Sequence, residues 1–163
     1  MHSRLHPDLL QFLQLGLSLY AGGNDAHGWP QVARALAIRP LPGPQLALAL
    51  PAEQARGLLA AIAGTGHIAV VLCQPTTHYT VQIKGRDACI EPMDAEAWPE
   101  LRRNRDAFGV EIKPYGFDAD FADAWFSVAG NGMDALRVVR FTPCGAWNQT
   151  PGPGAGAAME WLA

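Results

Sequence analysis

The sequence predicts one α+β domain, mainly antiparallel β, in which the strands form a barrel and a few helices lie at its periphery. Apolar residues make up 49% of the 163 residues and charged residues 17%, a balance typical of a globular core. Six or so strand-like segments are separated by Gly- and Pro-rich turns and follow one another as hairpins rather than in strict alternation with helices. The sequence contains no internal repeat and no linker, so residues 1–163 are expected to form a single domain.

The first half of the chain is predicted to contain two helices and four strands. Pro7 suits a first helical turn, and Gly16 can end that helix. The turn Gly22-Gly23-Asn24-Asp25 is a hairpin signal, and Pro51 can open the second helix. The predicted ranges are a helix at 7–16, strands at 17–21, about 31–39 and 45–50, a helix at about 52–63 and a buried strand at Ile68–Cys73.

The second half is predicted to contain two further helices between two strands. Asp94 and Asp118 are good helix N-caps, whereas Pro99 is awkward in a helix interior and is expected to shorten or bend its helix. The predicted ranges are a strand at 77–84 that can extend to Ile90, helices at 94–108 and 118–127, and a long strand at 135–147.

The net charge of −3 argues against a nucleic-acid partner, because neutralising phosphates requires a surplus of Lys and Arg. The charge is also unevenly distributed. Residues 1–90 carry six Lys and Arg against four Asp and Glu, whereas residues 91–163 carry six against eleven. A site for a small anion is therefore expected in the first half.

The cysteine pattern predicts a reduced protein without a metal site. Cys73, Cys89 and Cys144 are odd in number and form no C-x-x-C pair, so neither a zinc site nor a disulfide framework is expected. No apolar stretch approaches the roughly 20 residues that span a bilayer, and the N-terminal residues do not resemble a signal peptide. These features predict a cytoplasmic protein with no membrane partner.

The strand predicted at 77–84 alternates between polar and apolar residues. Because side chains alternate across a strand, one of its faces is polar and the other is apolar. The polar face is either solvated or a row of hydrogen-bond donors for a phosphate or the edge of a heteroaromatic ring. The polar face consists of His78, Thr80, Gln82, Lys84 and Arg86.

The strand predicted at 31–39 places Arg34 on its apolar side, while Arg39 faces the other way. A guanidinium on an apolar face is costly unless it is paired, and no acidic residue lies nearby in the sequence. Its partner is then a distant carboxylate or a bound anion, unless the side chain reaches past the strand edge into solvent. The apolar residues on its side are Val32, Leu36 and Ile38.

The Gly- and Pro-rich segment that follows the last predicted strand, at 148–156, is either a loose tail or a shaped loop against a ligand or a second subunit. No nucleophile elbow and no activated-cysteine context occur in the sequence, so it predicts no catalytic residue.

Three segments, in this order and spacing, resemble the pyridoxamine 5′-phosphate oxidase-related FMN-binding split barrels. Arg34-Ala-Leu-Ala-Ile-Arg39 resembles the R-x-x-x-x-[K/R] segment that contacts FMN in the family. The segment from Pro75 to Gly85 resembles a later strand, where a polar stripe ending in Lys-Gly meets the flavin. The ending from Phe141 to Pro153 is similar to that of one subgroup, and the likeness spans roughly residues 8–156.

The resemblance implies a six-stranded split barrel and a homodimer with FMN in a cleft between the subunits. It implies that Arg34, Arg39 and Lys84 face the phosphate, and that Thr80 and Gln82 lie near the ribityl chain or ring. The full set of cofactor-binding residues implied in this way is Arg34, Ala35, Ile38, Arg39, Thr80, Gln82, Lys84, Gln149 and Thr150, the last two toward the partner subunit's flavin.

One departure from the family pattern limits the expected reaction. The oxidases end in an Arg-x-His segment that holds pyridoxal phosphate, and this chain has no such segment, so oxidation of vitamin B6 is not expected. The leading hypothesis is an FMN-dependent oxidoreductase with a small-molecule substrate or electron donor. The alternatives are a haem-binding or haem-handling split barrel, and a flavin-binding protein without turnover, with F420 in place of FMN as a further variant.

Overall fold

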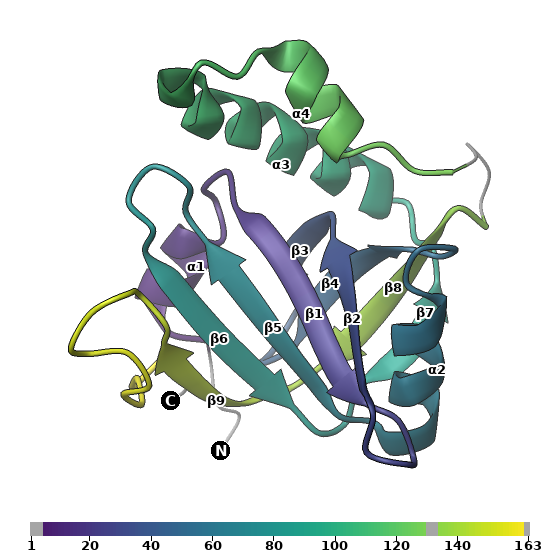
Figure 1. Cartoon of the computed structure of the whole chain (residues 1–163). Coiled ribbons are helices and arrows are strands. Elements are labelled where there is room, and N and C mark those ends of the chain that lie inside the picture. Colours follow the sequence, from purple (N-terminus) through teal and green to yellow (C-terminus); the bar gives the residue numbers. More distant parts are fainter. Residues whose placement is uncertain (1–4, 130–133, 162–163) are drawn as a thin grey trace.

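The computed structural model describes residues 5–129 and 134–161, which form two antiparallel β-sheets with helices around them (Figure 1). One sheet has five strands in the order β2-β1-β5-β6-β9, and the other has four in the order β3-β4-β8-β7. The strands are β1 (Ser18–Asn24), β2 (Pro30–Ala35), β3 (Ala37–Pro40), β4 (Leu46–Pro51), β5 (Ile68–Cys73), β6 (Thr80–Gly85), β7 (Cys89–Pro92), β8 (Leu136–Phe141) and β9 (Pro143–Asn148).

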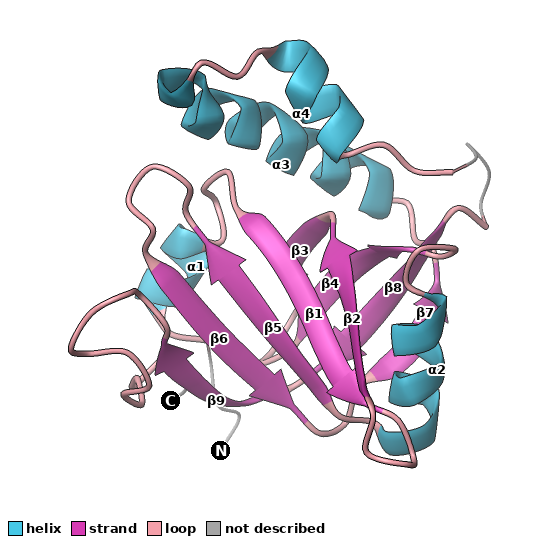
Figure 2. Ribbon diagram, viewed as in Figure 1, coloured by secondary structure: helices cyan, strands magenta, loops and turns pink. Residues whose placement is uncertain are grey.

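Helices lie at the edges of this two-layer arrangement (Figure 2). The helices α3 and α4 lie together across one end of the sheets, and α2 flanks β2 and β7. The helices are α1 (Pro7–Phe12), α2 (Arg56–Thr65), α3 (Ala97–Ile112) and α4 (Ala119–Trp125), with a 3₁₀ turn at Lys113–Tyr115. The predicted α+β class with mainly antiparallel strands and peripheral helices is confirmed.

The inner faces of the two sheets enclose the main hydrophobic core. The buried side of β6 supplies Val81 and Ile83 to this core, and β8 supplies Phe141, all with no exposed surface. A second apolar cluster lies beneath α3 and α4 and includes Leu36, which is also fully buried.

Two of the predicted long strands, and the predicted extension of a third, are wrong in the same way, because each is divided between the two sheets. The segment at 31–39 forms β2 and β3 with Leu36 between them, and the segment at 135–147 forms β8 and β9 with Thr142 between them. The segment at 77–90 likewise divides into β6 and β7. The count of six barrel strands is therefore not confirmed, since the described residues contain nine strands.

Other predicted elements agree with the structure apart from their ends. The buried strand Ile68–Cys73 has the predicted bounds. Asp118 caps α4 as predicted, because its carboxylate accepts a hydrogen bond of 3.0 Å from Phe121 N. Pro99 does not bend α3, because it lies in the first turn, where its missing N–H is not needed.

The buried side chain of Asn104, in the middle of α3, joins the helix to both sheets. Its Oδ1 accepts a hydrogen bond from Leu17 N (3.1 Å), and its Nδ2 donates to Leu17 O (3.2 Å) and Leu36 O (3.0 Å). The chain leaves α1 for β1 at Leu17 and crosses between the sheets at Leu36. Asn104 therefore satisfies backbone groups at two points that strand pairing leaves open.

Replacing Asn104 by Leu is expected to lower the free energy of unfolding by about 3 kcal/mol or more. The variant keeps the number and branching of the side-chain heavy atoms but leaves three buried backbone groups without partners, at about 1–3 kcal/mol each. Urea unfolding measures the effect, and Arg102→Ala, an exposed change on the same helix, is the control. Equal stability of the two variants would show that the Asn104 contacts are dispensable.

The turn between β6 and β7 contains a carboxylate that holds the start of β9. Asp87 accepts a hydrogen bond of 2.7 Å from Thr142 N. Desolvation by burial raises the pKa of Asp87, but the hydrogen bonds from Thr142 and the charge of Arg140 outweigh it, so the pKa lies below its ordinary value.

Asp87→Asn is expected to lower stability by about 1 kcal/mol at pH 7, because one charge-assisted hydrogen bond is lost at an exposed site. A depressed pKa contributes stability above the ordinary pKa of the carboxyl, and this contribution disappears as the pH falls through the folded-state value. The two proteins should thus begin to converge in urea unfolding as the pH falls below about 4, and the difference should vanish only below the folded-state pKa of Asp87. Glu53→Gln, at an exposed carboxylate, is the control. A stability difference that persists at low pH would contradict the assignment.

Candidate functional site

The outer face of the five-stranded sheet carries the predicted polar stripe. In β6, Val81 and Ile83 are buried, whereas Gln82 is half-buried and Lys84 is exposed on the opposite face. The alternation predicted for this strand is therefore confirmed. His78 does not continue the stripe, because it lies in the preceding turn with a positive φ of 57°.

A groove of about 850 Å³ lies over this face. Strand pairing aligns Val32, Gly22, Ala69, Lys84 and Gly145 in one row across the sheet. Gly22 and Ala69, in the middle of that row, have no large side chain, whereas Val32 and Lys84 lie on either side of them. The groove is hollow because small residues form its floor.

The groove is cationic although the protein is acidic overall. Lys84, Arg86 and His67 line it, and its described lining contains no Asp or Glu. A concave surface with cations and no carboxylates attracts anions. The remaining lining residues are Gly22, Gly23, Asn24, Pro30, Gln31, Val32, Ile68, Ala69, Gln82, Gly85, Cys144 and Trp147.

One wall of the groove is formed by a lysine on an indole. Lys84 Nζ lies 4.7 Å from the centroid of the Trp147 ring. The indole also lies close against the backbone of Gly145, where a Cβ would be 2.2 Å from Trp147 Cη2. Only glycine fits at this position with the ring as it stands.

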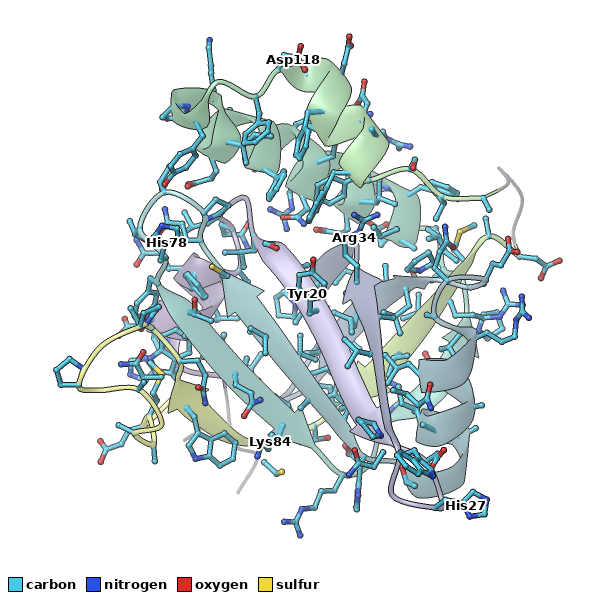
Figure 3. The ribbon with its side chains drawn as sticks, in the orientation of Figure 1. Tyr20, His27, Arg34, His78, Lys84 and Asp118 are labelled. Atoms are coloured by element: carbon cyan, nitrogen blue, oxygen red, sulfur yellow. The ribbon has the colours of Figure 1, made fainter. Side chains whose placement is uncertain are left out.

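Arg34 lies at the other end of the outer face, beneath α3 and α4, and Lys84 lies toward the opposite end (Figure 3). The expectation that Arg34 shares a buried apolar face is wrong: the inward residues of β2 are Ala33 and Ala35, and Val32 is 69% exposed. The Arg34 guanidinium lies 4.6 Å from the Trp125 ring centroid, and its buried Nε has no hydrogen-bond partner among the described residues. Its partner within the described chain is thus an aromatic ring.

The structure does not bring the three predicted phosphate-binding cations together within one chain. Arg34 and Lys84 are three strand spacings apart across the sheet and two residues out of register, so at least about 14 Å separates their backbones. Arg39 is on the four-stranded sheet, where its guanidinium donates a hydrogen bond to Asp94.

The other predicted site residues fall into two groups. Ala35 and Ile38 have buried side chains in the main core, so only their backbone could meet a ligand. Thr80, Gln149 and Thr150 lie together where β6 begins and β9 ends. Thr80 N donates to Thr150 Oγ1 (3.0 Å), and Gln149 N donates to Thr80 O (2.7 Å).

Sequence reasoning missed several residues of the groove. Arg86 was recognised as part of the polar stripe but not as a site residue. Its position two residues after Lys84 could have indicated that both side chains lie on the same face of the sheet. His67 and Trp147 come from other strands or turns, and only the pairing of β1, β5, β6 and β9 brings them to the same face.

The described residues lack two features that mark other classes of protein. No helix among them is both long and apolar enough to cross a membrane. No group of three or more His, Cys, Asp or Glu side chains is arranged there to hold a metal ion.

No protein-family model and no curated protein matches the sequence. Solved structures do match its fold. HupZ of Group A Streptococcus is 14% identical, covers 91% of this chain and 98% of its own, and has a TM-score of 0.55. A pyridoxamine 5′-phosphate oxidase candidate from Lactobacillus delbrueckii is 16% identical over 90% of this chain and 99% of its own, with a TM-score of 0.51.

The chain has the fold of the pyridoxamine 5′-phosphate oxidase-related proteins. An F420 reductase has the same fold, at 15% identity over 83% of this chain and 93% of its own and a TM-score of 0.50. The resemblance found in the sequence is thus confirmed for the fold. Proteins with this fold differ in function, so the fold by itself assigns no ligand to this chain.

The contact between Arg34 and Trp125 can be measured by a double-mutant cycle. Arg34→Met and Trp125→Leu should show a coupling of about 0.5–1 kcal/mol in urea unfolding, as expected for a cation over an indole. Arg34→Met alone should cost far less than the about 3–5 kcal/mol of a broken buried ion pair. Arg56→Met, at an exposed arginine of α2, is the control. Additive effects of the two substitutions would contradict the contact.

Proposed function

We propose that the chain is a cytoplasmic FMN-dependent oxidoreductase that binds the flavin in this groove, at a cleft between two copies of the chain, and acts on a small-molecule substrate or electron donor. The observation that carries the proposal is the charge of the groove. Lys84, Arg86 and His67 line it without any carboxylate, in a protein of net charge −3. FMN carries a phosphate, the group that such a surface recognises best.

The shape and polarity of the groove also support a flavin. Its volume of about 850 Å³ lies within the usual range for cofactor sites, and it is open along the sheet. Gln82 projects from β6 into the same groove and offers an amide donor and acceptor for the edge of a heteroaromatic ring. When bound, FMN would supply the hydride and electron chemistry, and the residues of the chain would supply orientation and charge compensation.

The positions of Arg34 and Lys84 on the outer face support a second copy of the chain. Arg34 and Lys84 lie too far apart in one chain to hold one phosphate. If two outer faces meet about a twofold axis that runs between them and perpendicular to the line from Arg34 to Lys84, the Arg34 end of one chain faces the Lys84 end of the other. Tyr20 and Val32, which are 40% and 69% exposed, then lie within the contact. In this arrangement Arg34 of the partner subunit reaches the flavin bound beside Lys84.

Haem is the second candidate, and one residue favours it. The His67 imidazole lines the groove and is a potential axial ligand, while Lys84 and Arg86 offer charges for two propionates. The absorption spectrum of the purified protein distinguishes the two ligands, because flavin and haem have characteristic and different visible bands. Reconstitution with haem and no uptake of FMN would contradict the leading proposal.

Lys84→Ala is expected to weaken FMN binding by about 1.5–3 kcal/mol, because a charge-assisted contact to the phosphate is lost. Fluorescence titration of FMN against the wild type and the variant measures the change. Lys113→Ala removes the other lysine of the chain, which lies outside the groove, and should leave the affinity unchanged. Equal effects of the two substitutions would indicate nonspecific attraction only.

Mixed dimers test whether each flavin site is formed by residues from both chains. Arg34→Met and Lys84→Ala chains, each carrying a different tag, are co-expressed and purified as heterodimers. If each site takes Arg34 from one chain and Lys84 from the other, the mixed dimer contains one intact site and should bind one FMN with wild-type affinity. If each site were formed within one chain, both sites of the mixed dimer would be defective and neither would bind FMN with wild-type affinity. A wild-type protein that is monomeric would exclude a cleft between two subunits.

A further inference from the structure

The wall of the groove formed by Lys84 and Trp147 has a feature that the binding of a phosphate alone does not explain. Lys84 and Gly145 are paired across β6 and β9, and Gln82 is paired with Trp147. The indole extends along its own strand from Trp147 to lie over Gly145, and Lys84 Nζ lies over the ring. The lysine therefore covers a ring that would otherwise face the groove.

The backbone beneath the ring fits it closely. A Cβ on Gly145 would lie 2.2 Å from Trp147 Cη2, 2.8 Å from Cζ3 and 3.0 Å from Cζ2. These distances are far below van der Waals contact, so any side chain at 145 would push the indole away from this position. Gly145 is thus a positioning residue for Trp147.

The ammonium group of Lys84 has two possible partners. A cation on an exposed indole is held weakly, because water competes for it. A phosphate binds the same ammonium more strongly through charge-assisted hydrogen bonds. An anion in the groove would therefore draw Lys84 off the ring and expose an apolar face, on which a planar group can stack.

We infer that Trp147 is the stacking surface of the groove, that Gly145 positions it, and that Lys84 exchanges between the indole and the anion of the ligand. The inference rests on the proposed function for the position of the ligand, and it specifies the class of ligand. The groove is expected to bind a planar aromatic ring that carries an anionic group more tightly than the same ring without that group. A neutral ring must compete with Lys84 for the indole, whereas a phosphorylated ring removes its competitor.

Binding of matched ligand pairs tests the selection. The probes are FMN against riboflavin, and 1-naphthyl phosphate against 1-naphthol. The wild type should bind the phosphorylated member of each pair at least about tenfold more tightly. In Lys84→Ala the neutral members should bind a few-fold more tightly than in the wild type, because the indole is uncovered. If the neutral ligands bind Lys84→Ala no more tightly than they bind the wild type, the inferred exchange of Lys84 between the indole and the anion is wrong.

The position of the ring is tested without any ligand. The ε-protons of Lys84 should show an upfield ring-current shift in the NMR spectrum of the wild type, which Trp147→Leu removes and Gly145→Ala reduces. Gly145→Ala should also weaken binding of 1-naphthyl phosphate by about tenfold or more. Gly64→Ala is the matched control, since a Cβ at Gly64 in α2 meets no atom within 4 Å.

The outcomes separate this inference from the proposed function. If the wild type binds 1-naphthyl phosphate as described but not FMN, the flavin proposal fails and the inference stands. If Lys84 shows no ring-current shift, or if Gly145→Ala and Gly64→Ala bind the phosphate probe equally, the inference is wrong even where FMN binds. If neither phosphorylated probe is preferred over its neutral partner, the selection is likewise excluded.

Discussion

The arrangement of the two sheets depends on one buried amide. Three strand-like stretches of the chain cross from one sheet to the other, and the crossing at Leu36 leaves a carbonyl that no neighbouring strand can satisfy. Asn104 of α3 donates to that carbonyl and pairs with both backbone groups of Leu17, where β1 is about to begin. Gly16 lets α3 approach at this point, because a Cβ there would lie 2.2 Å from the backbone of Ala107. The helix, the first strand and the crossing are thereby fixed together.

The crossing at Leu36 also decides which residues can share a site. It separates Arg34 from Arg39, which a single strand would have kept five residues apart on one sheet. Arg34 stays on the outer face of the five-stranded sheet beside Trp125, whereas Arg39 joins the other sheet and pairs with Asp94. The family-like segment therefore does not act as one phosphate clamp within a chain. A phosphate clamp of the kind that the resemblance implies would require a second copy of the chain or a different set of cations.

Hydrophobic periodicity and helix-capping residues predicted those elements of the fold that depend on neighbouring residues in the sequence. The continuous apolar segment Ile68–Cys73, the alternation in β6 and the Asp118 cap follow from periodicity and capping, and all are confirmed. The crossings were missed because the apolar residues of each segment continue without interruption across the point where the chain passes from one sheet to the other. The partner of Arg34 was also missed, since Trp125 is distant in sequence and only the packing of α4 brings it close. Sequence predicted Gln82 and Lys84 for the groove, but not the side chains from other strands.

The charge asymmetry of the sequence acquires a physical meaning in this arrangement. The acidic residues of the second half are concentrated on α3, α4 and the segments that flank them, away from the groove. The groove takes its cations from β6 and the turns beside it, and β9, which contributes Trp147 from the second half, carries no acidic residue. Small residues on β1 and β5 keep this surface concave, so the low-dielectric walls strengthen the field of Lys84 and Arg86. A protein with a net negative charge can thus present an anion site, because the fold places most carboxylates of its second half on the helices across one end of the sheets, away from the groove.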